Sequence, residues 1–196
     1  GTIGLIGDEP ELPYERPPLS KEYLAGDKPF ERIMLRPAAF WAEREVTHYA
    51  KHRVTDVDAM AQTLKCANGT TFTYGHLIWA AGGSPRMLPC PGGNAKGVFG
   101  VRRKSDVDAI MAALPSTQNI VVIGGGYIGL EAAAVLRKFD KSVALIESLD
   151  RVLSRVAGEP LSRFYEDQHR AHGVDLHLGI GVDEILTDED GAASGV

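Results

Sequence analysis

The sequence is poor in cysteine. Its 196 residues hold only Cys66 and Cys90, which lie too far apart for the paired spacing of a structural zinc site. His169, His172 and His177 lie close together in the chain, but no cysteine or carboxylate completes a ligand set with them. We therefore expect no metal site, and two reduced thiols of the kind found in cytoplasmic proteins.

Three further features are missing. No apolar run reaches the length of about 18 residues that crosses a bilayer, and the start "GTIGLIGDEP" lacks the regions of a signal peptide. The net charge of −5 shows no basic excess of the kind that binds nucleic acid. We expect a cytoplasmic protein with neither a membrane nor a nucleic acid as partner. The first residue is not Met, so we expect processing or the loss of the beginning of a longer chain; monomer and homodimer stay open.

The chain alternates apolar runs with turn-forming segments, which predicts an α/β protein. Residues 182–196 read as one arm of a hairpin whose partner is absent. The other expected elements are a strand at 2–6, a short helix at 21–25 capped by Ser20 and closed by Gly26, strands with a hairpin at 46–78, a strand leading into the glycine turn of 76–85, helices at 105–114 and 159–173, and a strand at 174–179.

The stretch "NIVVIGGGYIGLEAAAVLRKFDKSVALIES", residues 119–148, has the order strand, glycine turn, helix, strand. Gly124 permits the tight turn, Gly126 lets the backbone approach a pyrophosphate, and Gly129 lets the helix pack closely on the strand. Glu147 ends the second strand, where a carboxylate accepts both adenosine ribose hydroxyls and repels a 2′-phosphate. The stretch predicts an NAD(H) site; the alternative is a structural turn without a ligand.

Four further residues in and after this stretch are candidate cofactor contacts. Tyr127 and Ile128 follow the turn directly, and Glu131 lies in the first two helical turns. Glu131 is either a ligand contact or an acid placed favourably in the helix dipole. Arg155 is either a solvated loop residue or a group that reaches the adenosine end of the cofactor.

Residues 1–8 look like the second strand of another dinucleotide fold, since an apolar strand ends in Asp8 as the later one ends in Glu147. The preceding strand, glycine turn and helix, roughly 30 residues, are not present. We expect these two carboxylates at the carboxyl ends of two separate parallel sheets.

Three motifs, "GDEPELPYERPPLSKEYLAG", "AAGGSPR" and "GGGYIGLEAA", occur in this order. In this the chain resembles the FAD-dependent NADH:ferredoxin reductases of bacterial oxygenase systems, and also the related flavoproteins of the apoptosis-inducing-factor type. The similarity covers the whole chain but only the interior of the family's sequence. It implies two Rossmann-like domains, both incomplete: a partial FAD-binding domain at 1–104 and an inserted NAD-binding domain at 105–196.

The resemblance also implies FAD and NAD(H) as cofactors and a [2Fe–2S] ferredoxin as partner, which feeds a cytochrome P450 or a ring-hydroxylating oxygenase. Lys21 would lie near the reactive N5 of the flavin, and Glu131 would orient the nicotinamide carboxamide and pair with Lys21. The implied FAD contacts are Asp8 at the ribose, Arg16 and Arg102 along the flavin, Val54 at the adenine, and Ala80 and Gly82 in the "AAGG" turn.

The residues support part of this on their own. As the first residue of the expected helix, Lys21 would oppose the helix dipole, which an anionic partner or a flavin explains; an exposed lysine is the alternative. No cysteine lies between Asp8 and Gly26, where flavoprotein disulfide reductases carry a redox pair, so a one-electron metalloprotein acceptor fits. The basic run at 101–104 is either a ferredoxin docking patch or a solvated face.

Three alternatives to a ferredoxin reductase stay open. The first is a reductase of rubredoxin or another small acceptor. The second is a flavoprotein of the apoptosis-inducing-factor type, in which slow NADH oxidation changes shape or oligomeric state. The third is a nucleotide-binding module without a redox role. Because the first glycine motif and the family's later Gly-Asp motif are absent, we also expect the isolated chain to bind FAD poorly.

Overall fold

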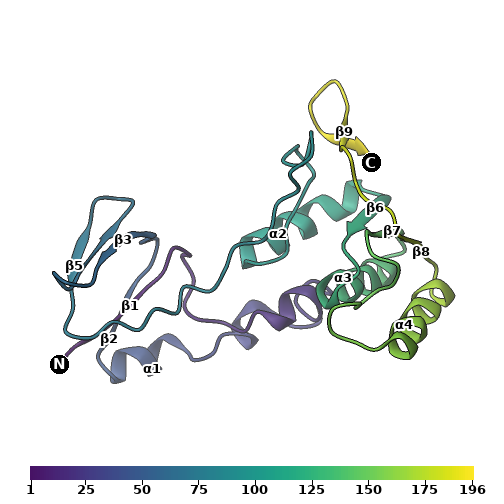
Figure 1. Cartoon of the computed structure of the whole chain (residues 1–196). Coiled ribbons are helices and arrows are strands. Elements are labelled where there is room, and N and C mark those ends of the chain that lie inside the picture. The colour runs from purple at the N-terminus through teal and green to yellow at the C-terminus, as the bar shows by residue number, and fades with distance from the viewer. The chain divides into compact units, whose positions relative to one another are not determined.

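The computed structural model describes all residues, 1–196, and divides them into two compact units. The first unit comprises Gly1–Glu15 and Phe30–Gly83, and the second comprises Arg16–Pro29 and Ser84–Val196 (Figure 1). The predicted limits 1–104 and 105–196 concern which cofactor each part binds, and they stay a prediction. None of the helices has both the length and the apolar character needed to span a bilayer.

The first unit contains two small sheets. In one, β1 (Ile3–Ile6) pairs in parallel with β2 (Val46–Tyr49). In the other, β3, β4 and β5 are antiparallel, and the predicted hairpin lies between the last two. The remaining bounds are β3 Val54–Asp58, β4 Thr63–Cys66, β5 Thr71–Thr73, the 3₁₀ helix η2 Phe30–Arg32 and α1 Ala38–Glu43.

The expected strand near 76–80 does not form. Residues 76–89 contain no strand or helix, and Ile78 and Trp79 are exposed. An apolar run becomes a strand only where another strand satisfies its backbone groups, and this run pairs with no strand of the chain. The prediction of a strand here was wrong.

The second unit is built on a parallel sheet in which β7 lies between β6 and β8. Its core joins α3 to this sheet through Leu130, Ala133 and Leu136 on the helix and Val143 and Leu145 on β7. This is the predicted strand, turn, helix and strand. The bounds are η1 Pro17–Ser20, α2 Lys104–Ala113, η3 Leu114–Ser116, β6 Asn119–Ile123, α3 Tyr127–Lys138, β7 Ser142–Glu147, α4 Glu159–Ala171, β8 Val174–Leu178, β9 Leu186–Thr187 and β10 Ala193–Gly195.

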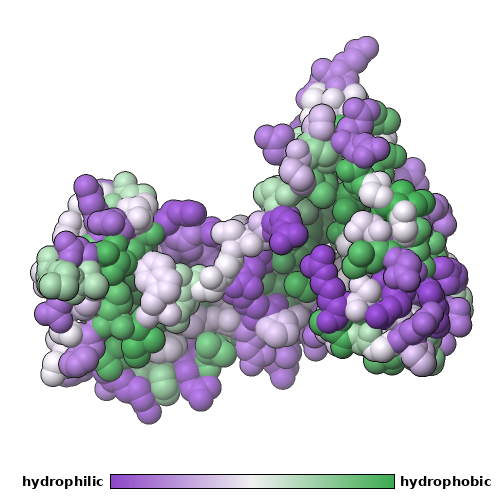
Figure 2. Space-filling view, viewed as in Figure 1, coloured by the Kyte–Doolittle hydropathy of each residue, from purple (hydrophilic) through white to green (hydrophobic).

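One face of strand β6, in the sheet of the second unit, is only partly covered. Val121 and Ile123 are 42% and 38% exposed, whereas the alternating residues Ile120 and Val122 pack against the core. Apolar side chains therefore reach the surface of this unit, and Figure 2 shows green residues among the hydrophilic ones. Parallel strands are normally buried on both faces, so β6 departs from that pattern.

The segment after the prolines differs from the prediction. Instead of a helix at 21–25 capped by Ser20, the 3₁₀ helix η1 ends at Ser20 and turns follow it. Pro17 and Pro18 have fixed φ values suited to a tight first turn, so the helical turn begins earlier than expected. Lys21 thus follows a 3₁₀ helix and does not open an α-helix, and the helix-dipole argument for it was wrong.

The end of the chain also differs. β9 and β10 pair antiparallel with each other, so residues 182–196 contain a whole small hairpin and not one arm of it. Asp188 closes the turn, because its side chain accepts the backbone N–H groups of Asp190 and Ala192 at 3.0 and 2.8 Å. Short polar side chains that bond to the following backbone favour such turns.

Candidate cofactor-binding site

The glycine turn joins β6 to α3 and has the features of an anion site. Gly124 has φ +108°, which side chains rarely adopt, and a Cβ on Gly129 would lie 2.0 Å from the carbonyl oxygen of Gly124. Gly126 is the N-cap of α3 and has open space where a Cβ would point. The first turn of α3 has no acidic residue and no side-chain cap, so a dinucleotide pyrophosphate fits its positive end.

Glu147 is the last residue of β7 and is held beside this turn. Its carboxylate accepts the backbone N–H of Gly125 at 2.7 Å and that of Leu149 at 2.9 Å. These two bonds fix the charge at the carboxyl end of the parallel sheet, where open α/β sheets bind ligands. The predicted ribose-binding carboxylate is therefore in a suitable place.

Tyr127 and Ile128 are 55% and 53% exposed in the first turn of α3, and Arg155 is exposed on the loop between β7 and α4. All three are accessible to a bound cofactor. Their cofactor contacts stay predictions.

The structure brings Lys21 and Glu131 together, as the resemblance implied. Lys21 Nζ lies 3.1 Å from Glu131 Oε1, and the two side chains are 40% and 30% exposed. Ser20 donates its hydroxyl to the other carboxylate oxygen, Oε2, at 2.7 Å. The sequence did not indicate this role of Ser20, because the expected helix used its hydroxyl as a cap.

Arg16 and Arg102 also meet. Arg16 donates Nη1 to the carbonyl of Arg102 at 2.7 Å, and the N–H of Arg102 is bound by Asp106 at 3.0 Å. Two residues that the resemblance assigned to the flavin thus lie side by side at the start of α2.

Another polar group ties the same segment to α2. Asp108 accepts the Tyr23 hydroxyl at 2.6 Å and Lys104 Nζ at 2.5 Å. Burial raises the pKa of Asp108, but the hydrogen bonds from Lys104 and Tyr23 and the charge of Lys104 outweigh it, so the pKa is lowered. The hydrogen bond to Asp108 raises the pKa of Lys104, and burial together with Asp108 raises the pKa of Tyr23.

The first unit holds the other candidates. Asp8 lies two residues beyond β1, with its carboxylate 3.8 Å from Arg53 Nη1. Val54 opens β3, while Ala80 and Gly82 are exposed in the irregular segment. Asp8, just beyond β1, and Glu147, the last residue of β7, thus lie at the carboxyl ends of strands in two separate parallel sheets, as expected. The contacts of all four residues with FAD stay predictions.

The family described as pyridine nucleotide-disulphide oxidoreductase matches residues 1–196. The chain belongs to this family. It is 58% identical, over its whole length and 48% of the relative's, to the ferredoxin reductase subunit of 5,5'-dehydrodivanillate O-demethylase from Sphingobium sp. strain NBRC 103272 / SYK-6. It is 55% identical, over its whole length and 47% of the relative's, to a ferredoxin–NAD(P)(+) reductase of a Sphingomonas species.

Among solved structures, the covalent putidaredoxin reductase–putidaredoxin complex superposes with a TM-score of 0.91 and 36% identity. The match covers 97% of this chain and 46% of the other. The chain therefore spans about half the length of its relatives, which agrees with the predicted similarity to the interior of the family's sequence. The predicted family and the α/β fold of dinucleotide-binding flavoproteins are confirmed.

Although the chain belongs to this family, it has no redox disulfide in the segment after Asp8, where flavoprotein disulfide reductases carry one. Residues 9–25 contain no cysteine, and neither Cys66 nor Cys90 forms a disulfide. In the place of a cysteine pair, this chain has the segment that carries Arg16, Ser20 and Lys21.

Proposed function

We propose that the protein to which this chain belongs is an FAD-dependent oxidoreductase that takes hydride from NADH and passes single electrons to a ferredoxin. The observation that carries the proposal is the contact of Lys21 and Ser20 with Glu131, which joins the segment "PPLSK" to the helix of the NAD motif. Residues from the two motifs thus form one polar site within the second unit.

The two cofactors would carry the redox chemistry, because NADH supplies a hydride and FAD accepts it and releases electrons singly. The residues of this chain would position a charge and orient a hydrogen-bond acceptor. Glu131 keeps the Lys21 ammonium in one place, where it would face the reactive edge of the flavin and stabilise negative charge that develops there. Its second carboxylate oxygen, oriented by Ser20, would take the carboxamide N–H of the nicotinamide.

The preference for NADH over NADPH is assigned to Glu147. Its carboxylate is already held by Gly125 and Leu149, so it cannot turn away from a 2′-phosphate without losing two hydrogen bonds. A fixed negative charge beside a phosphate is unfavourable.

The acceptor in the proposal is a [2Fe–2S] ferredoxin that serves a cytochrome P450 or a ring-hydroxylating oxygenase. The Sphingobium relative is named as the ferredoxin reductase subunit of an O-demethylase, and a similar reductase forms a complex with putidaredoxin. The absence of a cysteine pair at 9–25 supports an acceptor other than a protein disulfide. We place the protein in the cytoplasm.

The test is the visible absorbance spectrum of the complete protein, recorded before and after NADH, followed by reduction of a panel of iron–sulfur proteins. We expect a flavin spectrum that NADH bleaches at least as fast as the enzyme turns over. Among the iron–sulfur proteins, we expect the fastest electron transfer to a [2Fe–2S] ferredoxin. A protein without flavin would contradict the proposal. Faster transfer to rubredoxin, or slow bleaching with NADH-dependent dimerisation, would favour one of the alternatives.

A further inference from the structure

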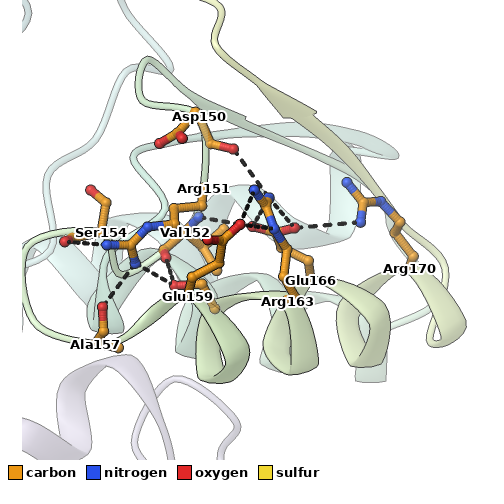
Figure 3. A network of polar contacts seen from close by, with 10 residues as sticks. Asp150, Arg151, Val152, Ser154, Ala157, Glu159, Arg163, Glu166 and Arg170 are labelled. Atoms are coloured by element: carbon orange, nitrogen blue, oxygen red, sulfur yellow. Dashed lines mark hydrogen bonds and ion pairs between the residues drawn. The ribbon is translucent and has the colours of Figure 1, made fainter.

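The loop between β7 and α4, residues 148–158, has no helix or strand, yet side chains hold its backbone at several points (Figure 3). Arg151 lies inside the loop. Its Nη1 donates to the carbonyl of Ala157 and to the hydroxyl of Ser162, both at 2.8 Å, and its Nη2 donates to the carbonyl of Ser154 at 3.0 Å. The loop thus wraps around its own guanidinium.

α4 fixes the middle of the loop. Glu166 is only 2% exposed and accepts the N–H of Val152 at 3.2 Å, while Ser162 donates its hydroxyl to the carbonyl of Val152 at 2.6 Å. Arg163 Nη1 contacts both oxygens of Glu166 at 3.2 and 3.0 Å. Burial of a carboxylate is unfavourable unless such partners compensate for it, so Glu166 is held firmly by Arg163 and by the N–H of Val152. Replacing Glu166 would weaken these bonds and release the loop.

The fixed residues of the loop contact the glycine turn. Leu153 donates its N–H to the carbonyl of Gly125 at 2.9 Å, and Val152 Cγ1 lies 3.0 Å from the place of a Cβ on Gly125. Gly125 in turn donates its N–H to Glu147 at 2.7 Å. An unbroken series of contacts therefore leads from Glu166 through Val152 to the glycine turn and Glu147.

We infer that Glu166 and Arg151 are positioning residues for the adenosine half of the dinucleotide site. Neither needs to touch the cofactor. They hold the loop, and the loop holds the glycine turn and Glu147 in the arrangement that receives the pyrophosphate and the ribose. The inference rests on the proposed function only in taking this turn as a nucleotide site, and it assigns no role to these residues at the nicotinamide half.

The test compares two ligands in the complete protein. Isothermal titration measures the affinity for ADP-ribose, and stopped-flow absorbance measures flavin reduction by reduced nicotinamide mononucleotide, which lacks the adenosine half. Glu166→Gln keeps the shape of the side chain but removes its charge, and we expect the Kd for ADP-ribose to rise about tenfold because the loop must be ordered on binding. Reduction by the mononucleotide should not change.

Glu159→Gln is the matched control, because Glu159 is an exposed carboxylate on the same helix that pairs with Arg163 but does not contact Val152. It should leave the affinity for ADP-ribose unchanged. Arg151→Lys keeps the charge but loses the forked donor, so it tests the loop if Glu166→Gln does not fold; its effect should match that of Glu166→Gln.

Two results would overturn the inference alone. One is an affinity for ADP-ribose that in both variants equals that of the unmodified protein. The other is a fall in the rate of flavin reduction by the mononucleotide as large as the fall in affinity for ADP-ribose. If the unmodified protein bound no ADP-ribose, the proposed nucleotide site would fall and this inference with it.

Discussion

At the scale of single residues, the site depends on carboxylates whose two oxygens have different partners. Glu147 receives one backbone N–H on each oxygen, and Glu131 receives Lys21 on one oxygen and Ser20 on the other. A carboxylate bound on both oxygens cannot rotate freely, so its charge and remaining lone pairs have a defined direction. Selectivity and orientation are therefore tested best at these two residues.

Glu147→Gln removes the charge and keeps a hydrogen-bond acceptor. We expect the ratio of kcat/KM for NADH to that for NADPH to fall about tenfold, since repulsion of the 2′-phosphate is lost, equivalent to roughly 1.4 kcal/mol. Steady-state kinetics with both nucleotides measures this. An unchanged ratio would exclude the ribose role of Glu147.

Ser20→Ala removes the hydroxyl that orients Glu131. We expect flavin reduction by NADH to slow about tenfold, the effect of a lost hydrogen bond to a charged group, with a smaller change in the Kd for NADH. Stopped-flow absorbance separates the two quantities. Ser20→Thr, which keeps a hydroxyl, should restore most of the rate; equal loss in both variants would instead indicate a packing defect at this buried position.

At the scale of elements, polar groups hold the segment 16–24 at three places: Arg16 binds Arg102 just before α2, Ser20 and Lys21 bind α3, and Tyr23 binds α2. The tie at Tyr23 depends on pH. The pKa of Asp108 is lowered, so its contribution is present above the ordinary carboxyl pKa and is lost as the pH falls through the lower folded value. The pKa values of Lys104 and Tyr23 are raised, so their contributions are lost at alkaline pH.

Asp108→Asn should therefore lower the free energy of unfolding between about pH 5 and pH 9, and the difference should shrink below about pH 4. Since the Asp108 side chain is 42% exposed, we expect a difference under about 1 kcal/mol. Urea unfolding at several pH values measures it. Asp27→Asn is the control, because Asp27 is an exposed carboxylate 3.9 Å from Lys138; a pH dependence equal to that of Asp108→Asn would contradict the assignment.

At the scale of the whole molecule, the chain has two units, and the glycine turn, Glu147 and the loop of Arg151 all lie in the second. A ligand that binds one folded unit stabilises that unit, by about 2.7 kcal/mol at a concentration of 100 Kd. Binding of the adenosine half is therefore expected to protect the second unit selectively.

Hydrogen exchange of the complete protein with ADP-ribose tests this expectation. Amide exchange should slow at residues 124–130 and 147–153, which include the turn, Glu147 and the fixed part of the loop. Exchange in β3, β4 and β5 of the first unit should not change. Protection centred on those strands would indicate that ADP-ribose binds the first unit, and it would contradict a nucleotide site at the glycine turn.

The elements that could be predicted from the amino-acid sequence are those whose signals are local. Glycines at 124, 126 and 129 follow one apolar run and precede another, and this pattern predicts a strand, a turn and a helix. The prediction succeeds because the whole signal lies within one short stretch of the chain. For the same reason the places of Asp8 and Glu147 at the ends of strands were predicted correctly.

The features that join distant residues could not be predicted in this way, because they depend on how the chain packs. Ser20 binds Glu131 across 111 positions of sequence, and Glu166 holds the backbone of Val152 from another element. The apolar run near 76–80 formed no strand, while the last hairpin closed on itself. Local sequence expresses what a segment prefers, but a strand, a buried charge or an oriented carboxylate also needs a partner, and only packing supplies it.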